Sequence, residues 1–177
     1  MDFAAFRQQV QAARQAVLQE MVAEGQGRVR IKKEATALGN LDRIFRATLK
    51  IANRKGFQAM TMRDLVRETG LSMGALYAYF AGKEALLTMM QAMHRRLAER
   101  VLQEGRDPAD TPRQALERLL PAHLYLSEVL HAWFYFSYME AKNLDPRHRE
   151  EAVAGSRITE EMIAELLEAG IAAGEFA

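Results

Sequence analysis

Apolar residues recur every three or four positions along nearly the whole chain, and this period constrains the fold more than any other feature. From Phe3 to Glu24 the stripe passes through Phe6, Val10 and Val17, on one face of an amphipathic helix. Alternating β-branched residues are scarce, and only 4 prolines interrupt the pattern. The spacing therefore predicts an all-α protein.

The composition excludes several classes of protein. No apolar run approaches the roughly 18 residues of a membrane span, so no membrane partner is expected. The chain has 0 cysteines and no signal-peptide pattern, which fits a cytoplasmic protein without disulfides or thiolate metal sites. The 4 histidines lack the spacing of a helical metal site. With no nucleophile or phosphate-loop motif, we expect no metal, no cofactor and no enzyme.

The charge of the chain is divided unevenly. Residues 28–83 hold 12 Lys and Arg against 4 Asp and Glu, whereas the whole chain has a net charge of only +1. The remainder is therefore acidic. A basic segment in an otherwise acidic protein is the electrostatic pattern of a module that binds a polyanion. A solvated helical surface is the alternative that charge alone leaves open.

The middle of the basic segment has the spacing of a helix-turn-helix. Thr61 stands three residues before Asp64, as in a capping box at a helix start. Gly70 and Leu71 form a short turn, and Ser72 can cap a second helix that reaches Phe80. In this motif the second helix enters the major groove of DNA. The spacing by itself fits an ordinary helical corner equally well.

A family resemblance adds to this pattern. The segment 41–87 resembles the DNA-binding domain of the tetracycline-repressor (TetR) family. The specific runs are Gly70-Leu71-Ser72-Met73-Gly74-Ala75-Leu76-Tyr77-Ala78-Tyr79-Phe80 and Lys83-Glu84-Ala85-Leu86-Leu87. The resemblance implies an N-terminal three-helix DNA-binding domain followed by a helical domain for effector binding and dimerisation. It also implies double-stranded operator DNA, a small-molecule effector and a second copy of the chain as partners.

The resemblance implies two kinds of DNA contact. Phosphate contacts fall on Thr61, Tyr77, Tyr79 and Lys83. Contacts with base edges or the groove fall on Met62, Arg63, Ser72, Met73, Gly74 and Ala75. Met73 and Ala75 offer only apolar contact, for example to thymine methyl groups, so Arg63 is the best candidate for a bidentate contact with guanine. A contact of Arg63 with phosphate or solvent is the alternative.

We divide the chain into an N-terminal extension (1–39), the helix-turn-helix domain (40–87) and a helical domain (88–177), with Asn40 as a helix cap. The extension is predicted to be a helix docked on the body or on a partner subunit, followed by a basic arm. Four residues of the arm are candidates for a minor-groove contact: Arg28, Arg30, Lys32 and Lys33. A basic tether that adds only non-specific attraction, or a role of the helix in dimerisation, are the alternatives.

The helical domain contains a bulky aromatic run at 131–139. In the family such a region surrounds a small-molecule pocket, and the predicted lining residues are His123, Tyr125, Trp133, Phe136 and Ser137. The alternative for each of these residues is that its side chain fills the core. The end of the chain, 169–177, resembles the end of the penultimate helix of the family, after which another helix usually completes the dimer interface.

The sequence thus predicts a transcriptional repressor that a small apolar or aromatic ligand releases from its operator. A helical small-molecule-binding or catalytic protein with an incidental helix-turn-helix is the alternative. The confinement of the basic charge to 28–83 argues against that alternative.

Overall fold

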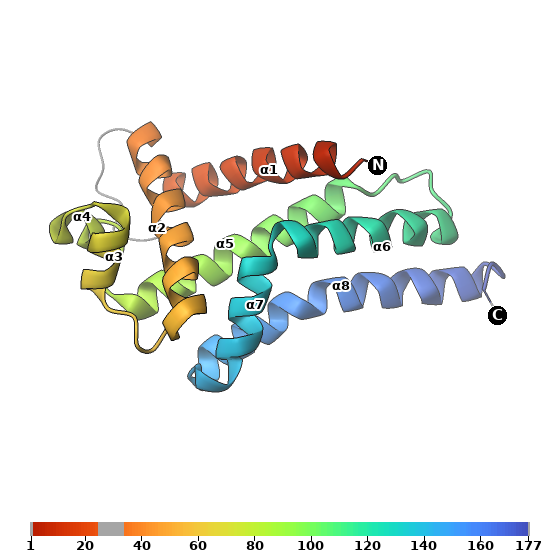
Figure 1. Ribbon diagram of the computed structural model, residues 1–177. Helices are drawn as coiled ribbons and strands as arrows, with labels where there is room; N and C mark the ends of the chain where they lie inside the picture. Colours follow the sequence, from red (N-terminus) through yellow and green to blue (C-terminus); the bar gives the residue numbers. More distant parts are fainter. Residues whose placement is uncertain (1, 25–33, 177) are drawn as a thin grey trace.

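The computed structural model describes residues 2–24 and 34–176, and in these ranges all regular structure is helical (Figure 1). The prediction of an all-α protein is confirmed. The helices are α1 (Phe3–Ala23), α2 (Glu34–Lys55), α3 (Met62–Thr69), α4 (Met73–Tyr77), α5 (Lys83–Glu104), α6 (Pro112–Val129), α7 (His131–Glu140), the 3-10 turn η1 (Ala141–Asn143) and α8 (Pro146–Ala172).

The N-terminal helix α1 is part of the body of the protein. It packs along α5 and α6 and also contacts α2 (Figure 1). The stripe seen in the sequence faces inward, since Phe6, Val10, Val17 and Met21 are all buried. An isolated helix of this length is marginal in water, so this burial stabilises it. The prediction of a docked helix is confirmed, whereas the basic arm lies outside the described residues.

Ion pairs fasten the polar side of α1 to two neighbouring helices. Arg100 of α5 pairs with Glu20 at 2.7 Å. Arg14 of α1 pairs with Asp42 of α2 at 2.9 Å. These contacts connect residues far apart in the sequence, so α1 holds α2 and α5 in a fixed relation to each other.

The start of α2 differs from the prediction. Asn40 was expected to cap this helix, but the helix begins at Glu34, and Asn40 lies within it. The apolar stripe extends backward, because Ala37 is buried in line with Leu41 and Ile44. This burial extends the helix past the polar residue at position 40, and α2 crosses the proposed boundary between extension and helix-turn-helix domain.

The remaining helices form the second half of the protein. Here α8 packs on α5 and α6, and α7 crosses to pack on α2 (Figure 1). The sequence predicted helices at 111–130, 131–143 and 146–170, close to the observed bounds of α6, α7 and α8. Among the described residues, no helix combines the length and apolar character needed to cross a membrane.

Candidate nucleic-acid interface

The first helix of the motif, α3, begins with the predicted capping box. The Thr61 hydroxyl accepts a hydrogen bond from the backbone N–H of Asp64 at 3.2 Å. In return, the Asp64 carboxylate accepts one from the backbone N–H of Thr61 at 2.8 Å. Two N–H groups that the helix leaves free are thereby satisfied. The helix ends at Gly70, whose φ of 69° is left-handed and favours glycine.

Asp64 also anchors α3 to α2. Its carboxylate pairs with Lys55 at 2.6 Å and with Arg67 in the next turn. Hydrogen bonds from Lys55 and then from Thr61 hold the pKa of Asp64 well below its usual range. The contribution of this carboxylate to stability is therefore complete above the ordinary Asp pKa of about 3.9. It is lost only as the pH falls from there toward the lower folded-state value.

The second helix, α4, is short, and the face that it exposes carries no charged side chain. Ser72 caps it by accepting a hydrogen bond from the N–H of Ala75 at 3.1 Å. Leu76 faces the core and is completely buried. The helix ends at Tyr77 rather than continuing to Phe80 as predicted, and turn residues follow. Gly74 is exposed and has no side chain, so another molecule can approach the backbone of α4 closely at this position.

Long-range contacts fix the motif to the helices on either side. The amide of Asn40 in α2 donates a hydrogen bond to the Tyr79 hydroxyl at 2.9 Å. Lys50 of α2 pairs with Glu68 of α3. Lys83, the first residue of α5, donates hydrogen bonds to the carbonyl of Phe57 at 3.0 Å and to that of Gln58 at 2.8 Å. The motif is thus a rigid unit continuous with α2 and α5.

Most residues predicted to contact DNA lie on the surface of this unit. Thr61, Arg63, Ser72, Gly74 and Tyr77 are exposed or partly exposed. Three further predicted residues on the same two helices are partly buried: Met62, Met73 and Ala75. The structure therefore gathers eight of the ten residues on α3, α4 and their N-terminal caps, at one end of the molecule (Figure 1).

The structure contradicts the prediction for Tyr79 and shows an additional role for Lys83. Tyr79 is completely buried and its hydroxyl accepts from Asn40, so a phosphate cannot reach it in this conformation. The reason is that α4 ends at Tyr77, and the turn after it directs Tyr79 into the core. Lys83 is half-buried, and its ammonium group already holds two carbonyls of the α2–α3 loop. These hydrogen bonds brace that loop, and a phosphate contact of Lys83 stays a prediction.

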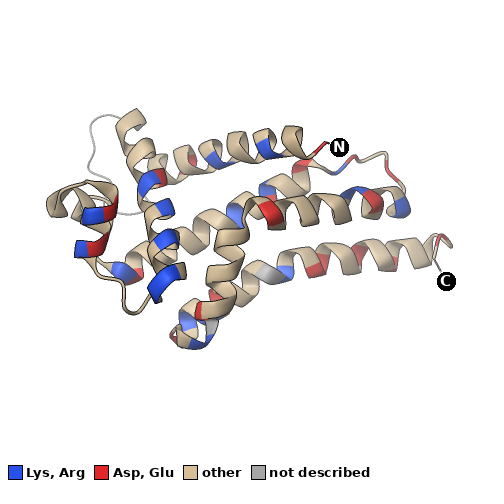
Figure 2. Ribbon diagram, in the orientation of Figure 1, with Lys and Arg blue, Asp and Glu red and all other residues tan. Residues whose placement is uncertain are grey.

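Charged residues lie on the helices next to the uncharged α4. Figure 2 shows Lys and Arg along α2 and both basic and acidic residues on α3, whereas α4, which packs on α3, carries no charged residue. Arg46, Arg54 and Arg63 are all exposed. A helix without charged or long polar side chains can enter a groove of the DNA. Exposed cations nearby can bind the phosphates that line the groove, and such contacts position a protein on the duplex.

The five predicted pocket residues do not share one cavity. His123 lies against α8, where the Thr159 hydroxyl meets its Nδ1 at 3.2 Å, and burial lowers the pKa of His123. Tyr125 packs on α1, with its ring centroid 5.2 Å from that of Phe3. Phe136 is buried against Phe57 of the α2–α3 loop, with their ring centroids 5.8 Å apart.

Trp133 and Ser137 do line a common hollow, between α5, α7 and α8, but its volume is only about 80 Å³. Sites for small molecules commonly measure about 300–1,000 Å³. Trp133 stacks on His94, with the rings 3.9 Å apart and nearly parallel. Burial, and then the charge of Arg14, lowers the pKa of His94 to about 3, so this ring is neutral. Its Nδ1–H donates to the carbonyl of Met90 at 2.8 Å.

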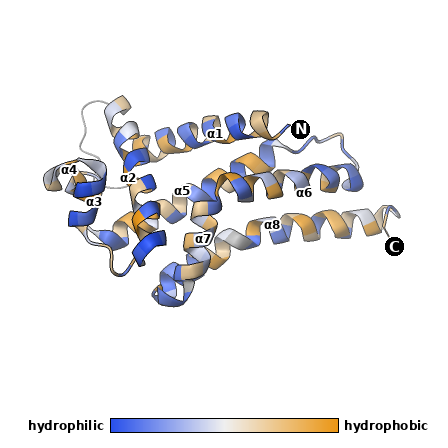
Figure 3. Ribbon diagram, in the orientation of Figure 1, coloured by the Kyte–Doolittle hydropathy of each residue, from blue (hydrophilic) through white to orange (hydrophobic). Residues whose placement is uncertain are grey.

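The larger exposed apolar side chains of the second half lie on α6, α7 and α8. Leu124 of α6, Tyr138 of α7 and Ile171 of α8 are 67%, 84% and 57% exposed. Figure 3 shows apolar and hydrophilic residues alternating along these helices. The exposed apolar surface is therefore concentrated away from α3 and α4.

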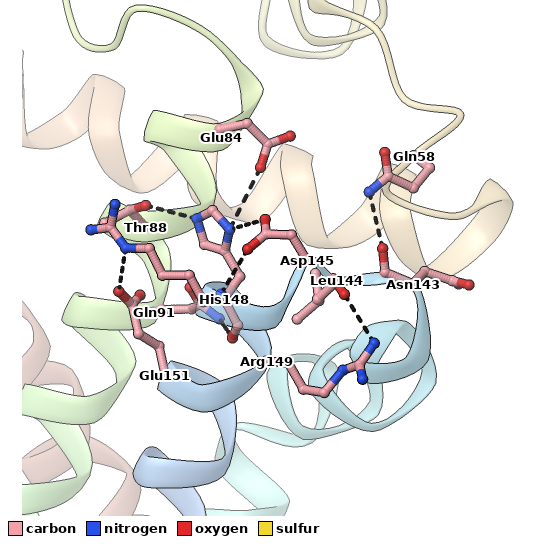
Figure 4. Close-up of polar contacts among 11 residues, drawn as sticks. Gln58, Glu84, Thr88, Gln91, Asn143, Leu144, Asp145, His148, Arg149 and Glu151 are labelled. Atoms are coloured by element: carbon pink, nitrogen blue, oxygen red, sulfur yellow. Dashed lines mark hydrogen bonds and ion pairs between the residues drawn. The ribbon is translucent and has the colours of Figure 1, made fainter.

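One polar cluster was not foreseen from the sequence. His148 is buried between α5 and α8, and its Nδ1 lies 2.5 Å from Asp145 and 3.7 Å from Glu84 (Figure 4). The opposite nitrogen of the ring meets the Thr88 hydroxyl at 2.9 Å. The hydrogen bond with His148 lowers the pKa of Asp145. The sequence spacing did not indicate this bridge, because Glu84 lies far from Asp145 along the chain. The cluster ties the start of α8 to the first turn of α5.

The fold and this surface define a helix-turn-helix protein with a helical second domain. The model of the family described as "bacterial regulatory proteins, tetR family" matches residues 44–90. The crystal structure of the TetR family transcriptional regulator PfmR from Thermus thermophilus is 30% identical, with a TM-score of 0.65. The match covers 76% of this chain and 74% of that one. The chain belongs to the TetR family of bacterial transcriptional regulators.

Relatives known from sequence agree. The uncharacterized HTH-type transcriptional regulator YfiR of Bacillus subtilis (strain 168) is 29% identical over 75% of this chain and 66% of its own length. The HTH-type transcriptional repressor KstR of Rhodococcus jostii (strain RHA1) is 36% identical over 51% of this chain and 39% of its own. The chain thus aligns with just under two thirds of the first relative and less of the second. Both relatives are transcriptional regulators by name, in agreement with the family to which this chain belongs.

Proposed function

We propose that this protein represses transcription by binding operator DNA as a homodimer and that a small molecule releases it. The observation that carries the proposal is the exposed, uncharged face of α4, which packs beside α3 and its exposed Arg63, with further Lys and Arg along α2. The second helix of such a motif lies in the major groove while the first crosses the backbone. Thr61 and Tyr77 are then placed for phosphates, and Arg63 for a guanine edge.

The proposed dimer follows from the size of the DNA-reading surface. A single α4 of five residues reads few base pairs, so two copies on half-sites one helical turn apart, ~34–36 Å, are expected. The exposed apolar residues of α6 and α8, among them Leu124 and Ile171, offer a surface for the second copy. Residues 40–87 would then form the DNA-binding domain and 88–177 the domain for dimerisation and effector binding.

The deciding experiment is selection of duplexes bound from a random library, at a stated salt concentration because phosphate contacts make affinity salt-dependent. We expect enrichment of an inverted repeat and a complex whose sedimentation corresponds to two chains or an even multiple. Binding of single strands with equal affinity, or no sequence preference at low salt, would refute a repressor role.

The same selection tests the basic arm. We propose that Arg28, Arg30, Lys32 and Lys33 reach the minor groove beside the site, where cations favour the narrow groove of A·T-rich sequence. Replacing all four by Gln should remove any A·T preference that flanks the inverted repeat and leave the repeat itself unchanged. If the substitutions lower only the salt-dependent, sequence-independent affinity for DNA, the arm adds non-specific attraction and the minor-groove assignment is wrong.

The third part of the proposal is control of DNA binding by a ligand. The sequence predicted that this ligand is an apolar or aromatic molecule that binds near Trp133 and Phe136. A ligand shifts the spacing of the two α4 helices only through different affinities for two conformations. The chain has 1 tryptophan, so its emission reports on α7 directly. We expect some member of an apolar and aromatic library to change both this emission and the thermal midpoint. If every compound leaves both unchanged, control by a ligand of this class is excluded.

A further inference from the structure

A hollow lies between α1 and α2, apart from the predicted pocket residues. Its volume is about 550 Å³, within the range of about 300–1,000 Å³ usual for small-molecule sites. One wall is α1, another is the first half of α2, and Val129 and Leu130 at the end of α6 close one side. The α1 wall lies outside the segment that matches the family model, which begins at residue 44.

The lining of this hollow has an excess of positive charge. Three arginines line it, Arg7, Arg14 and Arg46, against the single carboxylate of Asp42. Asp42 pairs with Arg14 at 2.9 Å and with Arg46 at 2.7 Å, so two guanidinium groups share one carboxylate. Arg7 forms no ion pair with any residue in 2–24 or 34–176. The segment 25–33 between the two helices contains four Lys and Arg and no Asp or Glu, so its composition supplies no counter-charge.

Among the three arginines, the excess of positive charge has its largest effect on Arg14. Its side chain is only 19% exposed. Its Nη2 is buried and has no hydrogen-bond acceptor among the described residues. Burial and the nearby Arg46 lower the pKa of Arg14, although Asp42 opposes them. A buried charged donor without a partner is costly, and an anion in the hollow would supply the acceptor.

The rest of the lining is apolar or amide-bearing. Val10, Leu18, Leu38 and Leu130 contribute apolar side chains to the lining. An inorganic anion would leave this surface uncovered. A molecule with an anionic head and an apolar tail would meet both parts of the lining.

We propose that the hollow binds a small amphipathic carboxylate, with its head on Arg14 and Arg7 and its tail against Val10, Leu18 and Leu130. Guanidinium groups bind carboxylates through paired, charge-assisted hydrogen bonds. The occupant touches α2, which braces the helix-turn-helix, and the α6–α7 junction at once. The site rests on the geometry of the hollow and is independent of the proposed function.

The test uses octanoate as the probe and the full chain without DNA. Its binding is measured by titration calorimetry and by the rise of the thermal midpoint, because a ligand of the folded state stabilises it. Octanamide has the same tail without the charge, and acetate the same head without the tail. We expect octanoate to bind at least about tenfold more tightly than either, equivalent to about 1.4 kcal/mol or more.

Variants locate the binding. Arg14→Gln should weaken octanoate about tenfold or more and leave octanamide unchanged. Because Arg14 also pairs with Asp42, Arg7→Gln provides a second variant at an exposed residue, with the same direction expected. The matched control is Arg95→Gln, since Arg95 is exposed and lines the 80 Å³ hollow instead. It should have no effect on octanoate.

The outcomes are distinct. Equal binding of octanoate and octanamide, an absence of octanoate binding, or a loss caused by Arg95→Gln alone would each overturn the site. Binding to the selected duplex is measured separately. If the protein ignores DNA yet binds octanoate through Arg14 and Arg7, the repressor function fails and the carboxylate site stands. If octanoate fails to bind while the duplex is bound, only the site is refuted.

Discussion

A carboxylate at position 74 is expected to abolish binding to duplex DNA while leaving the protein folded. Gly74 is exposed in the first turn of α4, and a Cβ added there meets no atom within 4 Å. Glycine is a weak helix former, and an acidic residue suits a helix N-terminus, so Gly74→Asp should fold as well as the parent. Against phosphates, however, a like charge costs several kcal/mol. The affinity should therefore fall at least about a hundredfold.

The measurement is fluorescence anisotropy of the selected duplex, with thermal unfolding as the check on folding. Gly155→Asp in α8 is the matched control, because that glycine also has open space around it and lies far from α4 along the chain. Gly74→Lys at the same position should retain binding of non-specific duplex. An unchanged affinity for Gly74→Asp would show that α4 does not face the DNA.

Truncating a buried residue of α1 is expected to destabilise the whole protein. Phe6 is 1% exposed and packs on Tyr125, with their ring centroids 5.6 Å apart. Removal of a buried phenyl ring leaves a cavity and typically costs about 3–5 kcal/mol. Phe6→Ala should therefore lower the free energy of unfolding by about this amount in urea titrations.

Gln8→Ala is the control on the exposed side of the same helix, where a change within about 0.5 kcal/mol is expected. Equal stability of the two variants would mean that α1 does not belong to the cooperative core. The same burial explains why the arm is better tested by charge removal than by deletion of residues 1–33. That deletion would remove the buried face of α1 together with the arm.

The helix-turn-helix was predictable because its signals are local. Thr61 and Asp64 form a capping box within four residues, and Gly70 and Ser72 end one helix and begin the next. Each of these signals acts on neighbouring backbone groups, so the sequence alone carries it.

Features that depend on distant contacts were not predictable. Asn40 has the chemistry of a cap, yet its partner is the Tyr79 hydroxyl, 39 residues away. Tyr77 and Tyr79 are equivalent in the sequence, but the end of α4 exposes one and buries the other. The aromatic run at 131–139 predicted a cavity, whereas its buried rings fill the core around Phe57 and His94. Which side chains share a hollow is decided by how helices pack, and a single helix does not encode it.

The position of α1 also has a consequence during biosynthesis. This helix is synthesised before the helices that cover its apolar stripe, because the surfaces on α5 and α6 are complete only when residue 129 has been made. At about 5–20 residues per second, this interval is roughly 5–20 s. During it, Phe6, Val10 and Val17 have no native partner on those helices. We therefore expect the nascent chain to expose an apolar segment before its fold is complete.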